Sequence, residues 1–457
     1  MNLGLLQKGD KMKILFINTI KLERFLETRY PSLSLAYLVS VLRNNFDNLQ
    51  FKIIDSNVEK ELDSFKPDVV GISSVSQNFN LAIEYARLVK KRDIKVLVGG
   101  VHISLLPRSL SKDMDIGVIG EGEKTIVELF KNNFENLDKI SGIIYWKDNK
   151  IKITRPRELI KDLDIIPYPA RDLLEIEDHT LMFTSRGCPY KCIFCSSSRF
   201  WKTVRYHSAE YVVNEIKLLI DKYNVKYIDF ADDLFISNKK RLKQIADLIK
   251  QEKIDIVFGC DARANMIDDE IMKLLKSINV QKIVLGLESG NDRILTYLKG
   301  IGGRSTVTVK QNYNAVKIAN KYGILVNAGF VIGSPDETKE EILDTLRLVK
   351  TSGLNHFEPY ILTPLPGTLI WELAKKRGLV SDNMDWNKLD VMFGENYKDA
   401  VILSEKLSRK ELYNLYKKFK KVQFYLRVKN SLLHPIKNNV LNIGTKYILS
   451  KLRKHFI

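Results

Sequence analysis

The chain has 457 residues, enough for two or three domains with separate cores, and its hydrophobic content of 45% is ordinary for a globular protein. It contains no run of about 18 apolar residues, so the pattern excludes a membrane-spanning helix, and its start lacks a signal-peptide cleavage site, which predicts a cytoplasmic protein. We interpret the formal net charge of +18 as solvated lysine faces, with an anionic partner as the alternative.

Residues 11–150 alternate short apolar runs with amphipathic helical stretches. Unbroken apolar runs of this kind are typical of parallel strands that helices cover on both faces. The pattern predicts an α/β fold that begins with an open, doubly wound (Rossmann-like) domain and ends in a hairpin at 141–155. The five predicted parallel strands are residues 13–19, 51–55, 69–74, 95–100 and 116–122.

A connector over residues 151–179 is marked by Pro156, Pro167 and Pro169, and we place the domain boundary there. A second series of strands and helices follows over 180–386 and predicts a partial (β/α)6 barrel. In such barrels the chemistry takes place at the carboxyl ends of the strands. The six predicted strands are residues 180–187, 226–233, 255–263, 282–289, 325–333 and 356–364.

The C-terminal region, residues 387–457, is predicted to be helical and basic. Residues 401–457 contain fourteen Lys or Arg, two Glu and no Asp. Aromatic side chains alternate with these lysines, which would suit nucleic-acid bases or anionic lipid, but we favour an amphipathic helix packed on the barrel. The aromatic residues are Tyr413, Tyr416, Phe419, Phe424 and Tyr425.

Three of the four cysteines lie close together, as Cys188, Cys192 and Cys195, directly after the first predicted barrel strand. Thiolates with C-x3-C-x2-C spacing can bind three corners of a cubane iron–sulfur cluster and leave one iron open to a small molecule. Structural zinc is the alternative, but it needs a fourth Cys or His at fixed spacing, and the sequence has none. Cys260 stands alone and is predicted to be a buried free thiol.

With Phe194 at the aromatic position of C-x3-C-x-aromatic-C, the segment resembles the radical S-adenosylmethionine superfamily. The resemblance implies a [4Fe–4S] cluster on the three cysteines, with S-adenosylmethionine chelated at the open iron and Phe194 near it. Reduction would then release a 5′-deoxyadenosyl radical. An open iron–sulfur site is oxygen-sensitive, which predicts an anaerobic setting.

Other segments at strand ends also resemble this superfamily. Gly286-Leu287-Glu288-Ser289-Gly290 resembles G-x-E-S-G, which implies that Glu288 and Ser289 contact the cofactor; a capped turn is the alternative. Asp232 begins a D-D-x-F segment that resembles cobalamin-linked members, with a helix N-cap as the alternative. Arg263 is assigned either to the cofactor carboxylate or to a surface ion pair. Residues 329–338 and 363–368 resemble further family segments.

The N-terminal domain resembles, over roughly residues 12–140, the cobalamin-binding domain of a large radical subfamily. Its candidate loops follow three strands and are rich in small residues, whereas no G-x-G-x-x-G indicates a dinucleotide. Asn18 and Thr19 stand where the methionine-synthase type has D-x-H-x-x-G, so we expect cobalamin without a histidine lower ligand. The resemblance implies cobalamin contacts at Ser73, Ser74, Gly99, Gly100, His102, Gly120, Glu121 and Gly122, with His102 predicted as a hydrogen-bonded turn residue.

The first functional hypothesis is therefore a cobalamin-dependent radical methyltransferase that acts on an unactivated carbon. The second keeps both cofactors for ring closure or oxidative rearrangement without methyl transfer. The third, from another class, is a basic binding module with a structural metal site. Methylthiotransferases are rejected because no cysteine precedes Cys188. The expected partners are a small-molecule or lipid-linked substrate, a flavodoxin- or ferredoxin-type electron donor and the membrane surface, but not nucleic acid.

Overall fold

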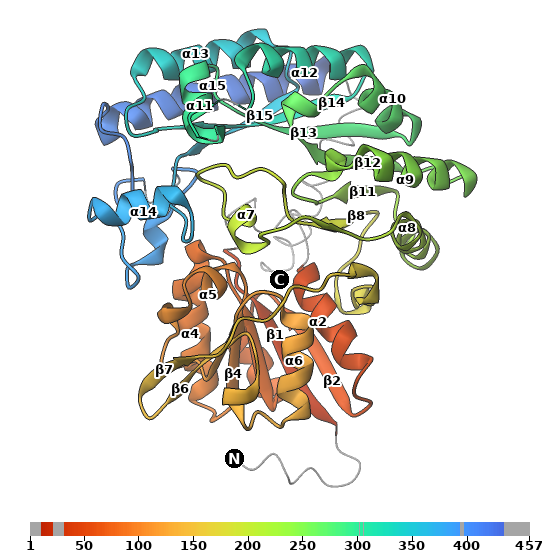
Figure 1. Cartoon of the computed structure of the whole chain (residues 1–457), viewed down its shortest axis with the longest axis vertical. Helices are drawn as coiled ribbons and strands as arrows, with labels where there is room; N and C mark the ends of the chain where they lie inside the picture. Colours follow the sequence, from red (N-terminus) through yellow and green to blue (C-terminus); the bar gives the residue numbers. More distant parts are fainter. Residues whose placement is uncertain (1–10, 22–31, 301, 305, 394–396, 434–457) are drawn as a thin grey trace. The chain divides into compact units, whose positions relative to one another are not determined.

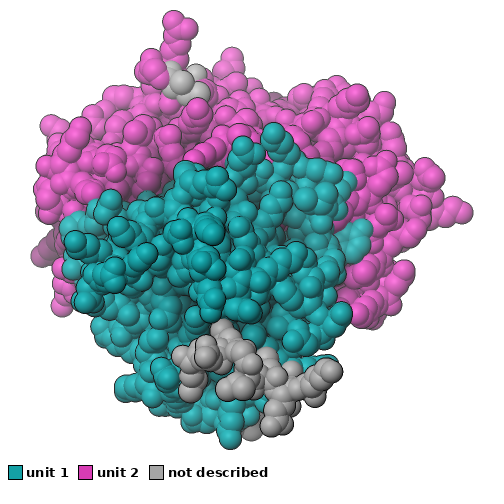
Figure 2. All heavy atoms as spheres, turned by 60° about the horizontal axis from the view of Figure 1, so that its bottom comes forward, with its two compact units in different colours: residues 1–176, 381–387 teal, residues 177–380, 388–457 magenta. Residues whose placement is uncertain are grey.

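The structure is a computed structural model that describes residues 11–21, 32–300, 302–304, 306–393 and 397–433. The chain divides into two compact units, which Figure 2 shows in different colours. Unit 1 comprises residues 1–176 and 381–387, and unit 2 comprises residues 177–380 and 388–457. Figure 1 labels many of their helices and strands.

Unit 1 is built on a seven-stranded sheet of order β2-β1-β3-β4-β5-β6-β7. Strands β1 to β5 are parallel, and the hairpin β6–β7 extends the same sheet in antiparallel fashion. Both faces of β1 are covered, because Ile14, Leu15, Phe16 and Ile17 are all buried. The strands are β1 (Met12–Asn18), β2 (Leu49–Ile54), β3 (Val69–Ser73), β4 (Lys95–Gly99), β5 (Ile116–Val118), β6 (Ile143–Lys147) and β7 (Lys150–Ile153).

The helices of unit 1 pack in pairs, with α2 against α6 and α3 against α4. The order β2-β1-β3-β4-β5 is that of a doubly wound domain, which confirms the predicted fold class. In such sheets the ligand site lies where the strand order reverses, here between β1 and β3. The helices are α2 (Leu33–Arg43), α3 (Val58–Phe65), α4 (Phe79–Lys90), α5 (Val101–Leu105) and α6 (Gly122–Lys131).

The predicted connector is in fact part of unit 1 up to residue 176. Its backbone is held by unit 1, since the Ala170 amide donates to the Ala36 carbonyl over 3.1 Å and the Ile160 amide donates to Glu121 Oε2 over 2.7 Å. Ile160, Leu163 and Ile166 are buried. The prolines therefore mark a packed segment rather than a free linker.

Unit 1 also includes residues 381–387, which the sequence placed at the end of the barrel. Asn80 donates to Asp385 over 2.6 Å, and Lys21 donates to Asn387 over 2.6 Å. Trp386 is buried, at 3% exposed. A short segment far along the chain thus completes the first unit.

Unit 2 contains six parallel strands in the sequential order β15-β14-β13-β12-β11-β8. The edge strands β8 and β15 are not paired with each other, so the sheet is an open, partial barrel as predicted. The strands are β8 (His179–Met182), β11 (Tyr227–Phe230), β12 (Val257–Ala262), β13 (Val280–Glu288), β14 (Leu325–Ile332) and β15 (His356–Ile361).

The helices that follow these strands begin at polar caps. In α8 to α14, a Ser, Thr, Asn or Asp side chain accepts a hydrogen bond from an amide of the first turn, which stabilises the helix start. These helices are α8 (Ala209–Tyr223), α9 (Lys239–Gln251), α10 (Asp269–Ser277), α11 (Asp292–Lys299), α12 (Val309–Lys321), α13 (Lys339–Thr351) and α14 (Leu369–Lys376).

The first predicted barrel strand, 180–187, differs from the structure. It divides into β8 and a two-residue strand β9 (Ser185–Arg186), which leaves the barrel sheet and pairs antiparallel with β10 (Arg205–Tyr206). The hydroxyl and amide groups of Thr184 and Ser185 bond a carboxylate instead of continuing the ladder, which accounts for the break.

The C-terminal helix α15 (Arg409–Leu433) packs on the barrel through β15. Its residues Leu412, Tyr416 and Phe419 are buried, and Gln423 donates to the Phe357 carbonyl over 2.6 Å. The predicted amphipathic packing is confirmed for this part of the tail, while residues 434–457 lie outside the described residues. Among the described helices none is long and apolar enough to cross a bilayer.

Candidate functional site

The cysteine loop runs from Gly187 to Val204, between β9 and β10. The antiparallel pairing of β9 with β10 closes the base of this loop. Gly187 has φ +96° and lies so close to the Thr203 carbonyl that a Cβ would meet it at 2.5 Å. Glycine is therefore required where the loop begins, because an L side chain would be strained and would collide.

The three thiols of the loop are held near one another. Burial raises the pKa of Cys188 to about 11, and the neighbouring Cys195 and Cys192 raise it further. Burial likewise raises the pKa of Cys195. The thiolate forms thus need a cation to compensate their charge, as a metal centre does.

The three cysteines are assigned to a cubane cluster, in which each thiolate binds a different corner. Among the described residues, no group of three or more His, Cys, Asp or Glu side chains is placed to hold a single metal ion. The choice between cluster and zinc rests on the sequence spacing, which offers no fourth Cys or His ligand for zinc.

Asp232 is buried and holds the strand that leads into the cysteine loop. Its Oδ1 accepts from the amides of Thr184 at 2.6 Å and Ser185 at 3.1 Å, and its Oδ2 accepts from the two hydroxyls at 2.5 and 2.7 Å. Each carboxylate oxygen therefore has two donors. The structure does not place Asp232 at a helix N-cap; its contact with the cofactor stays a prediction.

Asp233, the next residue, contacts the cysteine loop on both sides of the three cysteines. Its carboxylate accepts from the backbone amide of Gly187 and, over 2.5 Å, from the hydroxyl of Ser197. Gly187 precedes Cys188 directly, and Ser197 follows Cys195 by two residues. The paired aspartates after β11 thus organise the loop that carries the cysteines.

Arg263 lies against the cysteine loop, where its Nη1 donates to Cys192 Sγ over 3.3 Å. The residue is only 6% exposed, and its hydrogen-bond partners among the described residues are Cys192, Asn265 and Thr306, none of them a carboxylate. The alternative of a surface ion pair is wrong. The predicted contact with the cofactor carboxylate is not tested by these contacts.

The G-L-E-S-G segment ends β13 and is tightly bonded. Glu288 has φ +62° and forms an ion pair of 3.2 Å with the buried Lys299, whose ammonium also donates to the Gly286 carbonyl. Ser289 is fully buried, and its hydroxyl lies 3.1 Å from that of Thr345. A left-handed glutamate is uncommon and marks a backbone that its surroundings hold in place.

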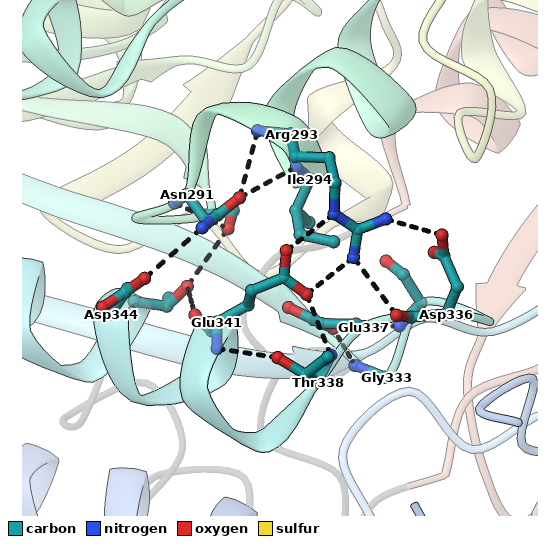
Figure 3. Close-up of polar contacts among 12 residues, drawn as sticks. Asn291, Arg293, Ile294, Gly333, Asp336, Glu337, Thr338, Glu341 and Asp344 are labelled. Carbon is teal, nitrogen blue, oxygen red and sulfur yellow. Dashed lines mark hydrogen bonds and ion pairs between the residues drawn. The ribbon is translucent and has the colours of Figure 1, made fainter. Parts of the chain in front are cut away.

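Figure 3 shows how the start of α11, which follows this segment, joins the loop after β14 and the start of α13. Asn291 caps α11, and Arg293 in the first turn of that helix donates to Asp336 over 2.5 Å and to Glu341 over 2.6 and 2.7 Å. Thr338 and Glu341 form a capping box at the start of α13. Two segments singled out in the sequence are therefore neighbours at the carboxyl ends of adjacent strands.

Glu337, in the loop after β14, is fully buried. Its Oε2 accepts from the amides of Gly333 at 2.7 Å and Ser334 at 3.0 Å, whereas its Oε1 has no hydrogen-bond partner among the described residues. Burial raises the pKa of Glu337 to about 7, although the two amides oppose this shift. The protonated form is therefore favoured in the folded chain.

Glu337→Gln should change the pH dependence of stability. The pKa of Glu337 is about 7 in the folded chain and 4.5 at its usual value. Protonated Glu337 therefore contributes to folding stability below pH 4.5, and this contribution is lost as the pH rises through about 7. Gln keeps an acceptor for both amides and carries no charge. We expect unchanged stability at pH 4.5 and a gain of up to about 3 kcal/mol at pH 8.5, measured by denaturant unfolding. The exposed Glu340→Gln is the control; an equal effect of both substitutions at pH 8.5 would contradict the assignment.

The cobalamin loops predicted for unit 1 meet at the carboxyl edge of its parallel strands. The Ser74 amide donates to the Gly99 carbonyl over 3.2 Å, and the Gly120 amide donates to Ser104 Oγ over 3.0 Å. A Cβ added at Gly99 or Gly120 would find nothing within 4 Å, so the backbone is open there to a flat ligand. Ser73 ends β3, and Gly122 begins α6. Gly100 packs so closely on Ser74 that a Cβ would lie 2.5 Å from the Ser74 carbonyl oxygen.

His102 is fully buried and both ring nitrogens are engaged. Nδ1 lies 3.0 Å from Ser76 Oγ and Nε2 lies 2.9 Å from Ser109 Oγ, and the ring stacks on Phe79 with Trp386 against its edge. Burial lowers the pKa of His102 to about 3, so the ring stays neutral. The predicted hydrogen bonding of His102 is confirmed and leaves no ring nitrogen for cobalt, but the residue lies in helix α5 rather than in a turn.

The other three predicted residues are all at least partly buried. Phe194 is half-buried, Glu121 is buried with its carboxylate on the Ile160 amide, and Cys260 is buried at 1% exposed, as predicted. Sequence reasoning missed three residues that contact the predicted site residues. Lys299 forms an ion pair with Glu288, the Trp386 ring packs edge-on with His102, and the Tyr190 ring lies under the guanidinium of Arg263. Of these three residues, only Tyr190 could have been found from the sequence, because it lies inside the cysteine motif.

Comparison with known proteins agrees with this arrangement. The model of the radical SAM superfamily matches residues 182–349, and the model of the B12 binding domain matches residues 26–130. An uncharacterized methyltransferase, PH0819 of Pyrococcus horikoshii, is 34% identical over 445 residues, which is 92% of this chain and 93% of the relative. Anaerobic magnesium-protoporphyrin IX monomethyl ester cyclase of Rubrivivax gelatinosus is 25% identical over 83% of this chain and 72% of its own length.

Among solved structures, the radical S-adenosylmethionine methyltransferase TsrM of Kitasatospora setae, with cobalamin and a [4Fe–4S] cluster bound, has the same fold. It aligns with a TM-score of 0.71 at 14% identity, over 89% of this chain and 88% of TsrM. The two family models identify the cofactors of the present chain as a [4Fe–4S] cluster, S-adenosylmethionine and cobalamin. The chain belongs to the radical S-adenosylmethionine superfamily, in the subfamily that carries an N-terminal cobalamin-binding domain.

Proposed function

We propose that the protein transfers a methyl group to an unactivated carbon of a small-molecule substrate. When bound, the iron–sulfur cluster and S-adenosylmethionine supply a 5′-deoxyadenosyl radical, and cobalamin supplies the methyl group. The observation that carries the proposal is the 34% identity to a relative named as a methyltransferase, which extends over both units.

The residues of unit 2 suit the radical part of this function. Asp232 and Asp233 hold the cysteine loop so that Cys188, Cys192 and Cys195 stay close together. The segment around Glu288 lies at the carboxyl end of β13, the edge of the barrel where ligands bind. We assign Phe194, Arg263, Glu288 and Ser289 to the surroundings of cluster and S-adenosylmethionine, with Asp232 acting through the loop.

Unit 1 suits a large flat ligand. The backbone at Gly99 and Gly120 faces open space, and the loops that carry them follow neighbouring parallel strands. His102 braces this edge from within by binding Ser76 and Ser109. We therefore assign Ser73, Ser74, Gly99, Gly100, Gly120, Glu121 and Gly122 to the cobalamin site and His102 to its support.

Ring closure or oxidative rearrangement remains the second candidate, because the magnesium-protoporphyrin cyclase of Rubrivivax gelatinosus is also a relative, at 25% identity. Labelling distinguishes the two functions. Reconstituted protein is incubated anaerobically with candidate substrates and S-adenosylmethionine that carries a deuterated methyl group. Deuterated methyl in the product supports methyl transfer; a product formed without label would refute it in favour of the second candidate.

Two finer proposals concern partners. A flavodoxin- or ferredoxin-type protein is the proposed electron donor, because the cluster must be reduced at low potential. Contact with the membrane surface is supported by Phe424 and Tyr425, which are 70% and 65% exposed on the basic helix α15. Cosedimentation with anionic liposomes should fall on Phe424→Ala with Tyr425→Ala, and absence of binding by the parent chain would refute the membrane contact.

A further inference from the structure

Arg263, the residue after β12, contacts the cysteine loop at two residues. Its Nη1 donates to Cys192 Sγ over 3.3 Å, and its guanidinium carbon lies 3.8 Å from the centre of the Tyr190 ring. Both contacts are to residues of the cysteine loop. A guanidinium over an aromatic face is attracted by the ring quadrupole, so Tyr190 helps to hold it there.

The other two guanidinium nitrogens of Arg263 also donate hydrogen bonds. Nε donates to Asn265 Oδ1 over 3.0 Å, and Nη2 donates to Thr306 Oγ1 over 2.6 Å. Asn265 in turn donates to the Tyr190 hydroxyl over 3.0 Å. The planar fork of arginine is thus fixed in one orientation, with one donor directed at sulfur.

The charge of Arg263 has no carboxylate partner among the described residues, although the residue is 6% exposed. A buried cation is costly unless a negative group lies beside it. Its neighbour here is Cys192, which becomes negative when it ligates iron as a thiolate. The structure therefore places the positive charge of Arg263 within hydrogen-bond distance of Cys192, one of the three assigned cluster ligands.

We propose that Arg263 is a positioning residue that sets the reduction potential of the cluster site through Cys192. In the reduction step the site gains one electron from a low-potential iron–sulfur or flavin donor, which loses one electron, and no covalent bond changes. Hydrogen bonds and positive charge next to the cluster sulfurs favour the state with the added electron. The proposal rests on the radical chemistry of the proposed function, but not on methyl transfer.

The test is a redox titration of the reconstituted full chain, followed by electron paramagnetic resonance, without substrate. Arg263→Gln removes the charge and keeps a donor, whereas Arg263→Lys keeps the charge. We expect the ratio of reduced to oxidised cluster at a fixed potential to fall about tenfold in Arg263→Gln, which equals about 59 mV for one electron. Arg263→Lys should lower this ratio less than Arg263→Gln does. Thr306→Val, which removes one hydrogen bond to the guanidinium, should leave the ratio unchanged.

Three outcomes would overturn the proposal. The first is equal potentials in Arg263→Gln and the parent chain. The second is loss of iron from Arg263→Lys, which would show a role in assembly. The third is weaker binding of S-adenosylmethionine to Arg263→Lys with an unchanged potential, which would show that Arg263 binds the cofactor carboxylate. The potential is measured without methyl transfer, so a negative labelling experiment leaves this test unaffected.

Discussion

Replacing Cys188, Cys192 or Cys195 with alanine is expected to abolish reductive cleavage of S-adenosylmethionine. Each thiolate is assigned to a separate corner of the cluster, so loss of one leaves an iron without a protein ligand. Loss of an outer partner of a metal site already costs about 10–100-fold, and loss of a ligand should cost more than about 100-fold. The measurements are iron per chain and formation of 5′-deoxyadenosine under strong reductant.

Cys260→Ala is the matched control for these substitutions. Cys260 is a free cysteine in β12, buried at 1% exposed, and burial raises its pKa well above the usual value. Cys260→Ala should retain full iron content, because Cys260 lies within a barrel strand and outside the cysteine loop. Loss of the cluster in Cys260→Ala, or its retention in Cys192→Ala, would contradict the assignment.

Asp232→Ala is expected to destabilise unit 2 and release the cluster. The substitution removes the acceptor for four donors of Thr184 and Ser185, and it leaves the nearby buried Arg241 without this compensating charge. Breaking a buried charged network in this way typically costs about 3–5 kcal/mol. For a unit of this size, the thermal midpoint should fall by roughly 6–20 °C.

Two variants separate this effect from general damage. Asp232→Asn keeps one oxygen for the two amides and should cost only about 1–3 kcal/mol, with iron partly retained. Asp221→Ala, on the exposed face of α8, should change neither the thermal midpoint nor the iron content. If Asp232→Ala melts like the parent chain and holds its iron, Asp232 does not organise the cysteine loop.

Sequence patterns predicted the strands well because hydrophobic periodicity and capping residues are local signals. The five parallel strands of unit 1 and the six of unit 2 were all expected within a few residues of where they lie. The break after β8 was not expected, because Thr184 and Ser185 leave the barrel sheet to bond the carboxylate of Asp232, which is 48 and 47 residues away, respectively. Local propensity contains no information about such a partner.

Domain boundaries were predicted less well for a similar reason. Pro156, Pro167 and Pro169 suggested a linker, but the backbone around them is bonded to unit 1. Residues 381–387 follow the barrel in sequence and yet belong to unit 1, where Trp386 packs on His102. Contacts over more than 280 residues leave no trace in composition or periodicity.

The sequence by itself determined the chemistry, because three thiols with fixed spacing, a partial barrel and a doubly wound domain are each encoded in short segments. Only the tertiary structure decided what surrounds the thiols. It placed Asp232 and Asp233 at the base of the loop and Arg263 against Cys192. These contacts depend on β11 lying beside β8 and on β12 lying beside β11. A side chain acquires such a role from the neighbours that folding supplies, and these neighbours are distant in sequence.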